Sequence, residues 1–381
     1  MVRAADAAAT VAAEQAPQPR IWLLMGHKAG DNQQVLAVAE ALGRPFETKR
    51  FVYKPYELWT NLLLGPTLAG VDRKASSQLA PPWPDLVISA GRRNEPVSRW
   101  LQAQARPKPV RLVHLGRPWA PLDAFDLIVS TPQYQLPARP NVLVNPLPLH
   151  RISPERLESA AAEWREDLAH LPGPLTALVV GGNSGPYLFD RAAADRLARL
   201  SEELAAREGG SLLITTSPRT PPEAVELLSR AFTRPHLFVP WQKDAARNPY
   251  LAFLALARSI IVTGDSVSML AEAAATGKPV YIFGFGRGRF AMKPEDRANR
   301  ALRLDDYAFW RPGRWNAFVS RLALCLGPKR LLRDVRRLHE ALIADGRAAW
   351  LGDEPPPGST APPVDPTDRM RARVEDLLTG A

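Results

Sequence analysis

The sequence predicts an α/β fold made of two doubly wound domains that face a central cleft. The chain has 381 residues, which is enough for about two domains at roughly 150 residues each. Its apolar fraction of 46% and charged fraction of 23% are typical of a folded globular chain. From Ile21 onward, short apolar runs bounded by Pro or Gly alternate with helical segments, which is the pattern of parallel strands joined by crossover helices.

The first half of the chain is expected to form one open, Rossmann-like sheet over residues 20–150. A strand at 21–25 leads through a Gly-containing loop into a helix at 33–42. The remaining expected elements are a helix around Trp59 to Leu64 and strands at 51–53, 85–89, 110–115, 126–130 and 141–144. The Ala-rich residues 1–19 contain Asp6 and Glu14 and no apolar core, which indicates a disordered tail rather than a secretory signal.

A charged helical stretch at 151–172 ends in the breaker Leu171-Pro172-Gly173-Pro174 and is expected to link the domains. The alternation then restarts and predicts a second doubly wound domain at 173–328. Its expected strands are 176–180, 211–215, 237–239, 260–263 and 280–283, with helices at 191–207, 222–231, 249–257 and 266–276. Residues 351–381 are expected to form a Pro-rich arm and a short terminal helix.

The net charge of +10 predicts an anionic partner, which is a phosphorylated substrate, an anionic membrane face or nucleic acid. Aromatic residues are not interleaved with the basic ones, which argues against nucleic acid. One dense basic stretch has helical spacing and is interpreted as a solvated helix face: Lys329, Arg330, Arg333, Arg336 and Arg337. We therefore expect an anionic glycan or glycolipid acceptor and peripheral contact with the inner membrane face of a cytoplasmic protein.

The single cysteine, Cys325, excludes an internal disulfide and any cluster of Cys ligands. Its apolar neighbours at 322–326 predict a core position. No apolar run reaches the ~20 residues needed to span a bilayer, and the best one, at 250–262, is broken by Arg258.

The most informative segment runs from Asn248 to Pro279. Asn248 is expected to cap a helix, and the strand that follows ends at Gly264, after which Asp265 or Ser266 is expected to cap another helix. The N–H groups and positive dipole end of that helix predict a phosphate site. One face of it is expected to carry Asp265, Ser268 and Glu272, with Glu272 accepting both hydroxyls of a ribose. The alternative is that Ser266 and Ser268 only cap and that Glu272 points into solvent.

Two more strand ends in the second half carry residues suited to a nucleotide diphosphate. The loop Gly181-Gly182-Asn183-Ser184-Gly185 lets the backbone approach a diphosphate, with Asn183 or Ser184 donating, or serves only tight packing. Arg219 is either a bidentate phosphate partner or an ordinary loop arginine.

In the first half, the loop from His27 to Gln34 follows the first strand and is expected to face the second domain. Asp31 is a candidate general base for an acceptor hydroxyl, and His27 is its rival. Asp31 also fits the N-cap of the next helix. Arg92, Arg93 and Arg117 lie at other strand ends, where they bind an anionic acceptor or pair with surface carboxylates.

Several of these segments resemble the elongated-mitochondria (mitochondrial fission ELM-type) family, whose bacterial members are described as glycosyltransferases. The resemblance extends from about Ile21 to Ala344, and the matching segments, which include Met269, are 114–118, 125–133, 181–185, 217–221 and above all 248–279. It implies a glycosyltransferase-B (GT-B) fold with the nucleotide-sugar in the second domain, and a bacterial setting near lipopolysaccharide-type glycan assembly. It also implies that a helix at 329–350 returns to the first domain. Plant members are named for mitochondrial fission.

One position departs from the family. Members carry a His-Asp pair after the proline that follows the strand at 125–131, and Gln133-Tyr134 stand there in this chain. The chemistry of that pair is therefore not carried over. The loop 27–34 matches a Lys-Ala-Gly pattern followed by Asp or His, which keeps Asp31 as the first choice for the base.

The expected reaction is attack of an acceptor hydroxyl on the anomeric carbon of a nucleotide-sugar. Helix N-termini, serine hydroxyls and Arg219 would stabilise the leaving diphosphate. The sequence contains no Asp-x-Asp motif, so no metal and no cofactor is expected. Two alternatives stay open: a nucleotide-sugar epimerase of the same fold, and a scaffold without turnover, which the missing His-Asp pair favours.

Overall fold

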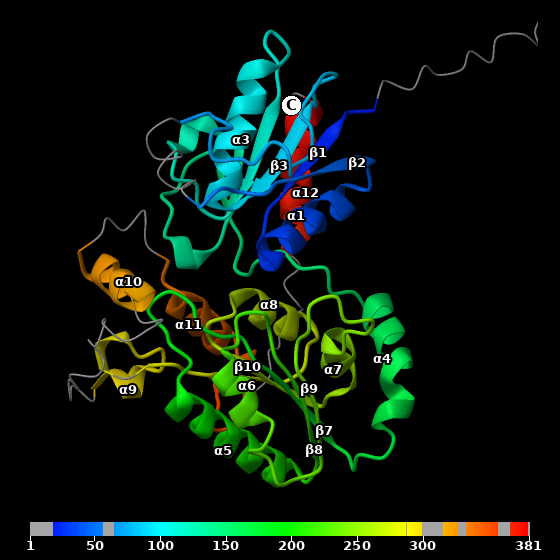
Figure 1. Cartoon of the computed structure of the whole chain (residues 1–381), viewed down its shortest axis with the longest axis vertical. Helices are drawn as coiled ribbons and strands as arrows, with labels where there is room; N and C mark the ends of the chain where they lie inside the picture. The colour runs from blue at the N-terminus through cyan, green and yellow to red at the C-terminus, as the bar shows by residue number, and fades with distance from the viewer. Residues whose placement is uncertain are drawn as a thin grey trace, which may run out of the picture.

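Two parallel six-stranded sheets organise the chain, one in each half of the sequence (Figure 1). The computed structural model describes residues 18–55, 65–286, 288–298, 315–326, 333–356 and 366–379. Most of the expected tail at 1–19, the helix around Trp59 to Leu64, and most of the Pro-rich arm lie outside these residues.

The first sheet has the order β2-β1-β3-β4-β5-β6. Its strands are β1 (Ile21–Met25), β2 (Phe46–Arg50), β3 (Leu86–Ala90), β4 (Arg111–Leu115), β5 (Leu127–Ser130) and β6 (Val142–Val144). Successive side chains of a strand point to opposite faces, so Leu23 packs beneath one helical layer and Leu24 beneath the other. The helices α1 (Ala29–Leu42) and α12 (Thr367–Thr379) cover the first face, and α3 (Gly91–Gln104) covers the second.

The second sheet has the order β12-β11-β10-β7-β8-β9 and shares one large core with its helices. Its strands are β7 (Leu175–Val179), β8 (Ser211–Thr215), β9 (His236–Val239), β10 (Ser259–Thr263), β11 (Val280–Phe283) and β12 (Ala348–Trp350). The helices are α4 (Pro154–Leu168), α5 (Arg191–Glu208), α6 (Pro222–Leu228), α7 (Tyr250–Leu256), α8 (Val267–Ala275), α9 (Pro294–Ala298), α10 (Trp315–Leu326) and α11 (Arg336–Ala344). Short 3-10 turns are η1 (Leu122–Ala124), η2 (Pro132–Tyr134) and η3 (Gly288–Phe290).

Three elements of the first domain and the last strand of the second differ from expectation. The prediction of a strand at 51–53 was wrong, because the strand β2 ends at Arg50. Strand β2 is a half-exposed edge strand without an apolar run, so its sequence does not stand out. Helix α1 begins at Ala29 rather than Gln33. Helix α3 was missed because its first turn is polar and it contains Pro96. Strand β12 was missed because it has only three residues.

Two helices near the end of the chain reach the first domain: α11, the helix expected at 329–350, and α12, which was not expected there. Helix α11 places Leu338 and Leu342 in the core of the second domain and also packs against η2 of the first domain. Helix α12 buries Met370 and Val374 in the first-domain core. On the way back, the chain passes Asn145, whose amide donates to the carbonyl of Pro366 at 3.2 Å.

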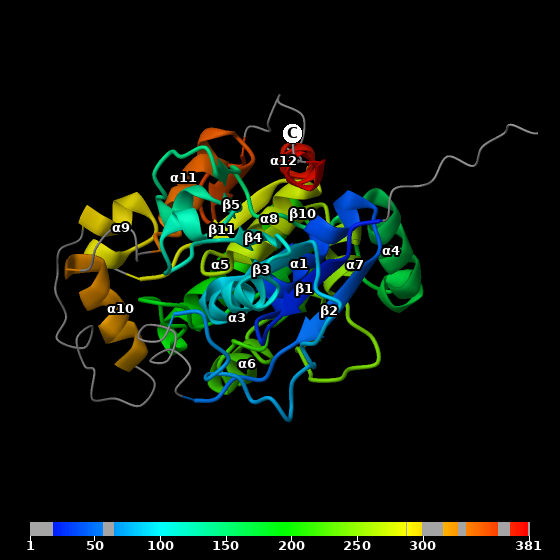
Figure 2. The same cartoon turned by 90° about the horizontal axis from the view of Figure 1, so that it is seen from above.

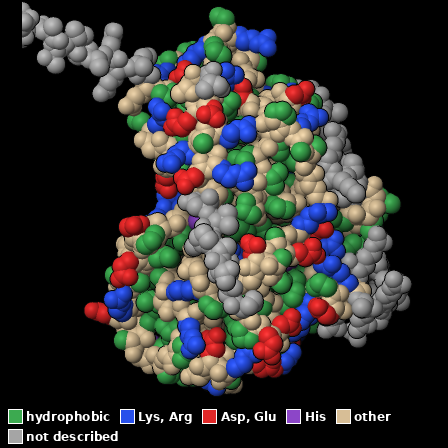
Figure 3. Space-filling model, turned by 180° about the vertical axis from the view of Figure 1, so that it is seen from behind, with side chains coloured by type: hydrophobic (Ala, Val, Ile, Leu, Met, Phe, Trp, Pro, Cys, Tyr) green, Lys and Arg blue, Asp and Glu red, His purple; other side chains and the backbone are tan. Residues whose placement is uncertain are grey.

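The prediction of a core position for Cys325 was wrong, because this residue is exposed on α10. Helix α10 lies at the edge of the molecule beside α9 in both views (Figures 1 and 2). None of the helices in the part of the chain that the structure describes is long and apolar enough to cross a bilayer. Figure 3 shows Lys and Arg interspersed with Asp and Glu on the face seen from behind, so the surplus positive charge does not form one patch there.

Candidate functional site

The candidate site lies where the strand order of each sheet reverses. In the first sheet β1 and β3 are neighbours, and in the second sheet β7 and β10 are neighbours, although neither pair is consecutive in the chain. In open α/β sheets the loops that follow such strands diverge and leave a crevice in which ligands bind. The segments that follow β1, β3, β7 and β10, with the first turns of the next helices, contain most of the candidate residues.

The loop after β7 is fixed by its neighbours. The N–H of Gly181 donates to Oγ1 of Thr263 at 2.7 Å, and the Ser217 hydroxyl donates to the Gly181 carbonyl at 3.0 Å. A Cβ at Gly182 would lie 1.9 Å from the carbonyl oxygen of Arg219, so only glycine fits there. The two glycines therefore serve close backbone packing, and their expected role toward a diphosphate stays a prediction.

Asp265 anchors this loop from the end of β10. Its Oδ2 accepts from the N–H of Gly182 at 3.0 Å and lies 2.8 Å from Nη1 of Arg219. Asp265 is 1% exposed, and burial raises the pKa of its carboxyl, with Arg219 acting in the opposite direction. The expectation that Asp265 caps the next helix was wrong. The Arg219 side chain remains 41% exposed, at the rim where it was expected.

Helix α8 begins at this rim without a side-chain cap. Ser266 occupies the N-cap position, but its hydroxyl makes no capping bond, so capping does not explain it. Ser268 lies in the first turn, directly against the first domain, since a Cβ at Gly30 would be 3.1 Å from its Oγ. Met269 is partly buried against the second-domain core. The first turn of α8 therefore faces the first turn of α1.

Glu272 lies one turn further along α8, on the side of α7. Its carboxylate accepts from the Tyr250 hydroxyl. Burial raises the pKa of Glu272, while Tyr250 and Arg156 act to lower it. The idea that Glu272 points into solvent was wrong. The prediction that Asp265, Ser268 and Glu272 share one helix face was also wrong, because the Asp265 carboxylate binds Gly182 and Arg219.

Three other predicted binding residues make local bonds. The Asn183 side chain accepts from the N–H of Phe189 at 2.7 Å, and Ser184 pairs through its backbone with Tyr187. Asn248 is exposed, and its side chain accepts from the N–H of Tyr250 at 3.0 Å, next to the first turn of α7. These bonds account for the three residues without a ligand, and their role in binding stays a prediction.

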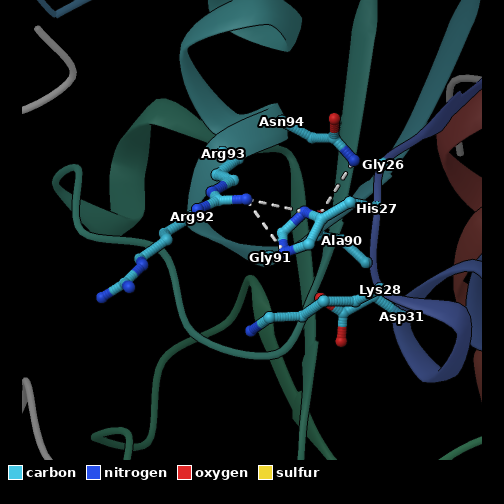
Figure 4. Close-up of a pocket in the computed structure, with 9 residues that line it drawn as sticks. All are labelled: Gly26, His27, Lys28, Asp31, Ala90, Gly91, Arg92, Arg93 and Asn94. Carbon is cyan, nitrogen blue, oxygen red and sulfur yellow. Dashed lines mark hydrogen bonds between the residues drawn. The ribbon is translucent and has the colours of Figure 1, made fainter. Parts of the chain in front are cut away.

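In the first domain, the loop after β1 and the first turns of α1 and α3 form a pocket (Figure 4). Its lining residues are Gly26, His27, Lys28, Asp31, Ala90, Gly91, Arg92, Arg93 and Asn94. The Asn32 side chain closes the first loop, because it both donates to and accepts from the Gly26 backbone at 2.9 Å. The pocket therefore combines four basic side chains with one carboxylate.

Asp31 is not the N-cap of α1. That position belongs to Lys28, and Asp31 lies in the first turn. Asp31 is close to Lys28. The pKa of Lys28 is lowered, mainly because burial of its ammonium group disfavours the charged form. Asp31 opposes this shift, whereas Arg333, Arg92 and Arg93 add to it. With the N-cap alternative removed, Asp31 is a carboxylate held beside a cationic group in the pocket.

The basic residues predicted to bind an acceptor have different surroundings. Nη1 of Arg93 lies 2.9 Å from both ring nitrogens of His27, and in Figure 4 Arg93 points toward that ring while Arg92 extends away from it. Arg92 lies over the Trp119 ring at 4.9 Å. Arg117 lies over Tyr134 at 5.5 Å, and burial lowers its pKa to about 10. Arg117 is thus set apart from the pocket.

The two domains meet at these loops and at η2. Besides the contact of Gly30 with Ser268, Arg333 donates to the Gln133 side chain at 2.8 Å, and the N–H of Asp334 donates to the Gln133 carbonyl at 2.9 Å. Two Rossmann-like domains whose strand ends face one another make the GT-B fold. Within the described ranges, no group of three or more His, Cys, Asp or Glu side chains is positioned to hold a metal ion.

A family model described as mitochondrial fission ELM1 matches residues 29–317, which is more than half of the chain. The chain belongs to the mitochondrial fission ELM1 family. The "Uncharacterized protein RP120" of Rickettsia prowazekii is 24% identical over 296 residues, covering 69% of this chain and 82% of that protein. The "Mitochondrial fission protein ELM1" of Arabidopsis thaliana is 28% identical over 227 residues, covering 53% of this chain and 52% of the plant protein.

Among solved structures, the chain is similar to the UDP-GlcNAc 2-epimerase of Neisseria meningitidis in its complex with UDP-GlcNAc. The TM-score is 0.47 at 12% identity, with 94% of this chain and 100% of that chain covered.

Four residues that position the site in this ELM1-family chain were not predicted: Lys28, Thr263, Tyr250 and His339. In the sequence, Lys28 is marked only as the lysine of the Lys-Ala-Gly pattern in the loop 27–34. The partners of Thr263 and Tyr250 lie far away in the sequence, so nothing local marks them. His339 donates from Nε2 to the carbonyl of Gly264 at 2.7 Å, just before Asp265. In the sequence, His339 is one buried position of an amphipathic helix, and nothing in its neighbours indicates a contact with Gly264.

His339 leads to a prediction about acid stability. It is fully buried, which lowers its pKa to about 4, and burial lowers the pKa of His114 to about 3. Between pH 6.5 and 4 the unfolded chain takes up a proton on each histidine while the folded chain does not. Each of the two histidines should therefore lower the free energy of unfolding by about 1.4 kcal/mol per pH unit as the pH falls through this range.

We expect His339→Gln, which keeps a donor for Gly264, to remove the share of His339 from this dependence. The measurement is urea unfolding at pH 7 and pH 5 for both proteins. Equal losses of stability in wild type and variant would contradict a buried neutral His339.

Proposed function

We propose that this ELM1-family chain transfers a sugar from a nucleotide-sugar to an acceptor hydroxyl. The observation that carries the proposal is the contact of Gly30 with Ser268, which brings the uncapped start of α8 against the pocket of the first domain. The N–H groups at the start of a helix bind phosphate well. A donor diphosphate at α8 would thus lie next to the group that activates the acceptor.

In the proposed reaction, the acceptor oxygen forms a bond to the anomeric carbon as the bond from that carbon to the diphosphate oxygen breaks. Asp31 takes the hydroxyl proton, and His27 is the alternative base. The N–H groups of α8 and the exposed guanidinium of Arg219 stabilise the charge that develops on the diphosphate. The mechanism as proposed uses no metal and no cofactor.

The basic residues of the first domain support an anionic acceptor. Lys28, Arg92 and Arg93 line the pocket together with His27, and this surplus of positive charge favours a phosphorylated glycan or glycolipid. With the net charge of +10, the same property supports peripheral contact with the inner membrane face and a role in cell-envelope glycan assembly.

Thermal unfolding with a panel of nucleoside diphosphates and their sugars tests the donor. A ligand that binds only the folded protein raises the melting temperature, by the equivalent of about 2.7 kcal/mol at 100 times its Kd. Stabilisation by one nucleotide series supports the proposal. If no nucleotide stabilises the protein, the chain keeps the fold as a scaffold. If the donor isomerises without an acceptor, it is an epimerase.

Glu272 is predicted to hold the ribose of that nucleotide. Charge-assisted hydrogen bonds of this kind contribute about 1.5 to 3 kcal/mol, so Glu272→Gln should weaken nucleotide binding roughly 10- to 150-fold. Calorimetric titration with a nucleoside diphosphate and its 2′-deoxy form is the measurement. Wild type should prefer the ribonucleotide, and Glu272→Gln should bind both forms equally.

Tyr250→Phe is the matched control, because it removes the hydrogen bond between Tyr250 and Glu272 but leaves the carboxylate in place. It should lower stability and retain the preference for the ribonucleotide. If Glu272→Gln also retains that preference, the ribose is held elsewhere.

A further inference from the structure

Arg333 belongs to the second domain, yet its side chain is held on the first. Two residues further on, Val335 is buried in the second-domain core. The Nε of Arg333 donates to the side-chain oxygen of the buried Gln133 at 2.8 Å, and the N–H of Asp334 donates to the Gln133 carbonyl at 2.9 Å. The interpretation of Arg333 as part of a solvated helix face was wrong, because α11 begins only at Arg336.

This contact between the domains lies beside the candidate pocket. Tyr134, which follows Gln133, packs on the end of β4, since a Cβ at Gly116 would lie 3.6 Å from its ring. Strands β3 and β4 are paired through their last residues, so Gly91 of the pocket and Gly116 follow adjacent strand ends. Arg333 is therefore held at the edge of the first sheet where the pocket lies.

The charge of Arg333 reaches the pocket. The pKa of Lys28 is lowered first by burial and then by three guanidinium groups, against the effect of Asp31. Arg333 acts on Lys28 more strongly than Arg92 and Arg93 do, although both of these line the pocket. Because the interaction between charges weakens with distance, the Arg333 guanidinium is close to the Lys28 ammonium.

The cations outnumber the carboxylates at this place. The pocket lining contains one carboxylate, Asp31, and the cationic groups that act there are Lys28, Arg92, Arg93 and Arg333. Like charges held together away from water raise the free energy of the folded chain, and a bound anion lowers it. The bond to the first domain uses one of the five N–H donors of the Arg333 guanidinium. Phosphate suits the site, because a guanidinium binds two of its oxygens through parallel N–H groups.

We propose that Arg333 binds a phosphate group of the acceptor together with the basic residues of the pocket, so that the acceptor bridges the two domains. The inference rests on the anionic acceptor proposed above and adds a residue of the second domain to its site. Because Arg333 comes from the second domain, the site is complete only when the domains are in contact. Binding of the acceptor then favours the arrangement in which the start of α8 meets the pocket.

Pyridoxal 5′-phosphate is the probe, because its aldehyde forms an imine with a lysine amine and its phosphate supplies the anion. We expect it to label Lys28 at a concentration about 10-fold below that needed with pyridoxal, which lacks the phosphate. Borohydride fixes the product, and peptide mass spectrometry measures the labelled fraction of Lys28. The same comparison at Lys74, an exposed lysine outside the pocket, corrects for the different reactivities of the two aldehydes.

Arg333→Gln should remove most of this preference for the phosphate-bearing reagent, a loss of about 10-fold, because a charge-assisted pair with the phosphate is lost. Arg337→Gln is the matched control. It removes the same charge from an exposed side chain four residues further on, within α11. The control variant should label Lys28 as wild type does.

The outcomes separate this inference from the function proposed above. If wild type and Arg333→Gln prefer the phosphate equally, Arg333 has no part in the site and the anionic acceptor stands. An equal loss in Arg337→Gln would show a general effect of charge and would also overturn the role of Arg333. If wild type shows no preference at Lys28, this inference and the anionic acceptor both fall. The thermal unfolding panel tests the donor separately.

Discussion

Asp31→Asn is expected to lower turnover by about 10²- to 10⁴-fold while the affinity for the nucleotide stays within about twofold of wild type. A positioned general base contributes an acceleration of that size, and asparagine cannot take the proton. The nucleotide is assigned to α8 in the other domain, so its binding should be largely unaffected. Release of nucleoside diphosphate from a stabilising nucleotide-sugar, with envelope glycolipid extract as acceptor, measures the turnover.

Stability must be checked for the same variant. Asp31 lies in the first turn of α1, where a carboxylate contributes about 0.3 to 1 kcal/mol through the helix dipole. Glu40→Gln is the control, because Glu40 is an exposed carboxylate on the same helix as Asp31. Glu40 lies outside the pocket and accepts a hydrogen bond from Arg151. If Asp31→Asn keeps its turnover, the role of base passes to His27.

Asp265→Ala should lower the free energy of unfolding by about 1 to 3 kcal/mol, the cost of leaving a buried hydrogen-bond donor without its acceptor. The N–H of Gly182 loses its acceptor in this variant, whereas the guanidinium of Arg219 is 41% exposed and is solvated by water when its partner is removed. Asp265→Asn keeps an oxygen for that N–H and should lose less. Urea unfolding of both variants gives the two values.

The pair Arg199–Glu203 is the matched control for Asp265. It is a 2.6 Å ion pair in the same domain, but its side chains are 60% and 56% exposed. Glu203→Ala should therefore cost at most about 1 kcal/mol. An Asp265→Ala variant as stable as Glu203→Ala would show that the loop after β7 is not held by this carboxylate.

The sequence predicted the sheets well because their strands are buried. The strands at 211–215 and 280–283 lie where they were expected, since each is an apolar run covered by helices on both faces. Strand β2 was misplaced for the opposite reason, because an edge strand is half exposed and carries polar residues. The docking of α12 was not predictable, since the pattern of an amphipathic helix does not identify the core it covers.

The sequence identified which residues follow strands, but not which groups their side chains contact. Residues that follow strands can be identified from the sequence, and those after β1, β3, β7 and β10 lie at the two reversals of strand order. Their partners cannot, because hydrogen-bonded pairs such as Gly182 with Asp265 are 83 positions apart. From the sequence alone, a polar residue after a strand could equally be a helix cap or a ligand contact. It could also be a buried residue that holds a neighbouring loop, as Asp265 does.

The return of α12 makes the second domain an insertion within the first. The polypeptide leaves the first domain after β6 and re-enters it before α12, and the two passages touch through Asn145 and Pro366. Two bodies joined by two adjacent tethers can pivot about that point, but they cannot separate or twist as freely as bodies on one tether. A rotation that moves Gly30 away from Ser268 would therefore centre on Asn145 and Pro366, so a donor and an acceptor bound to different domains would meet along a reproducible path.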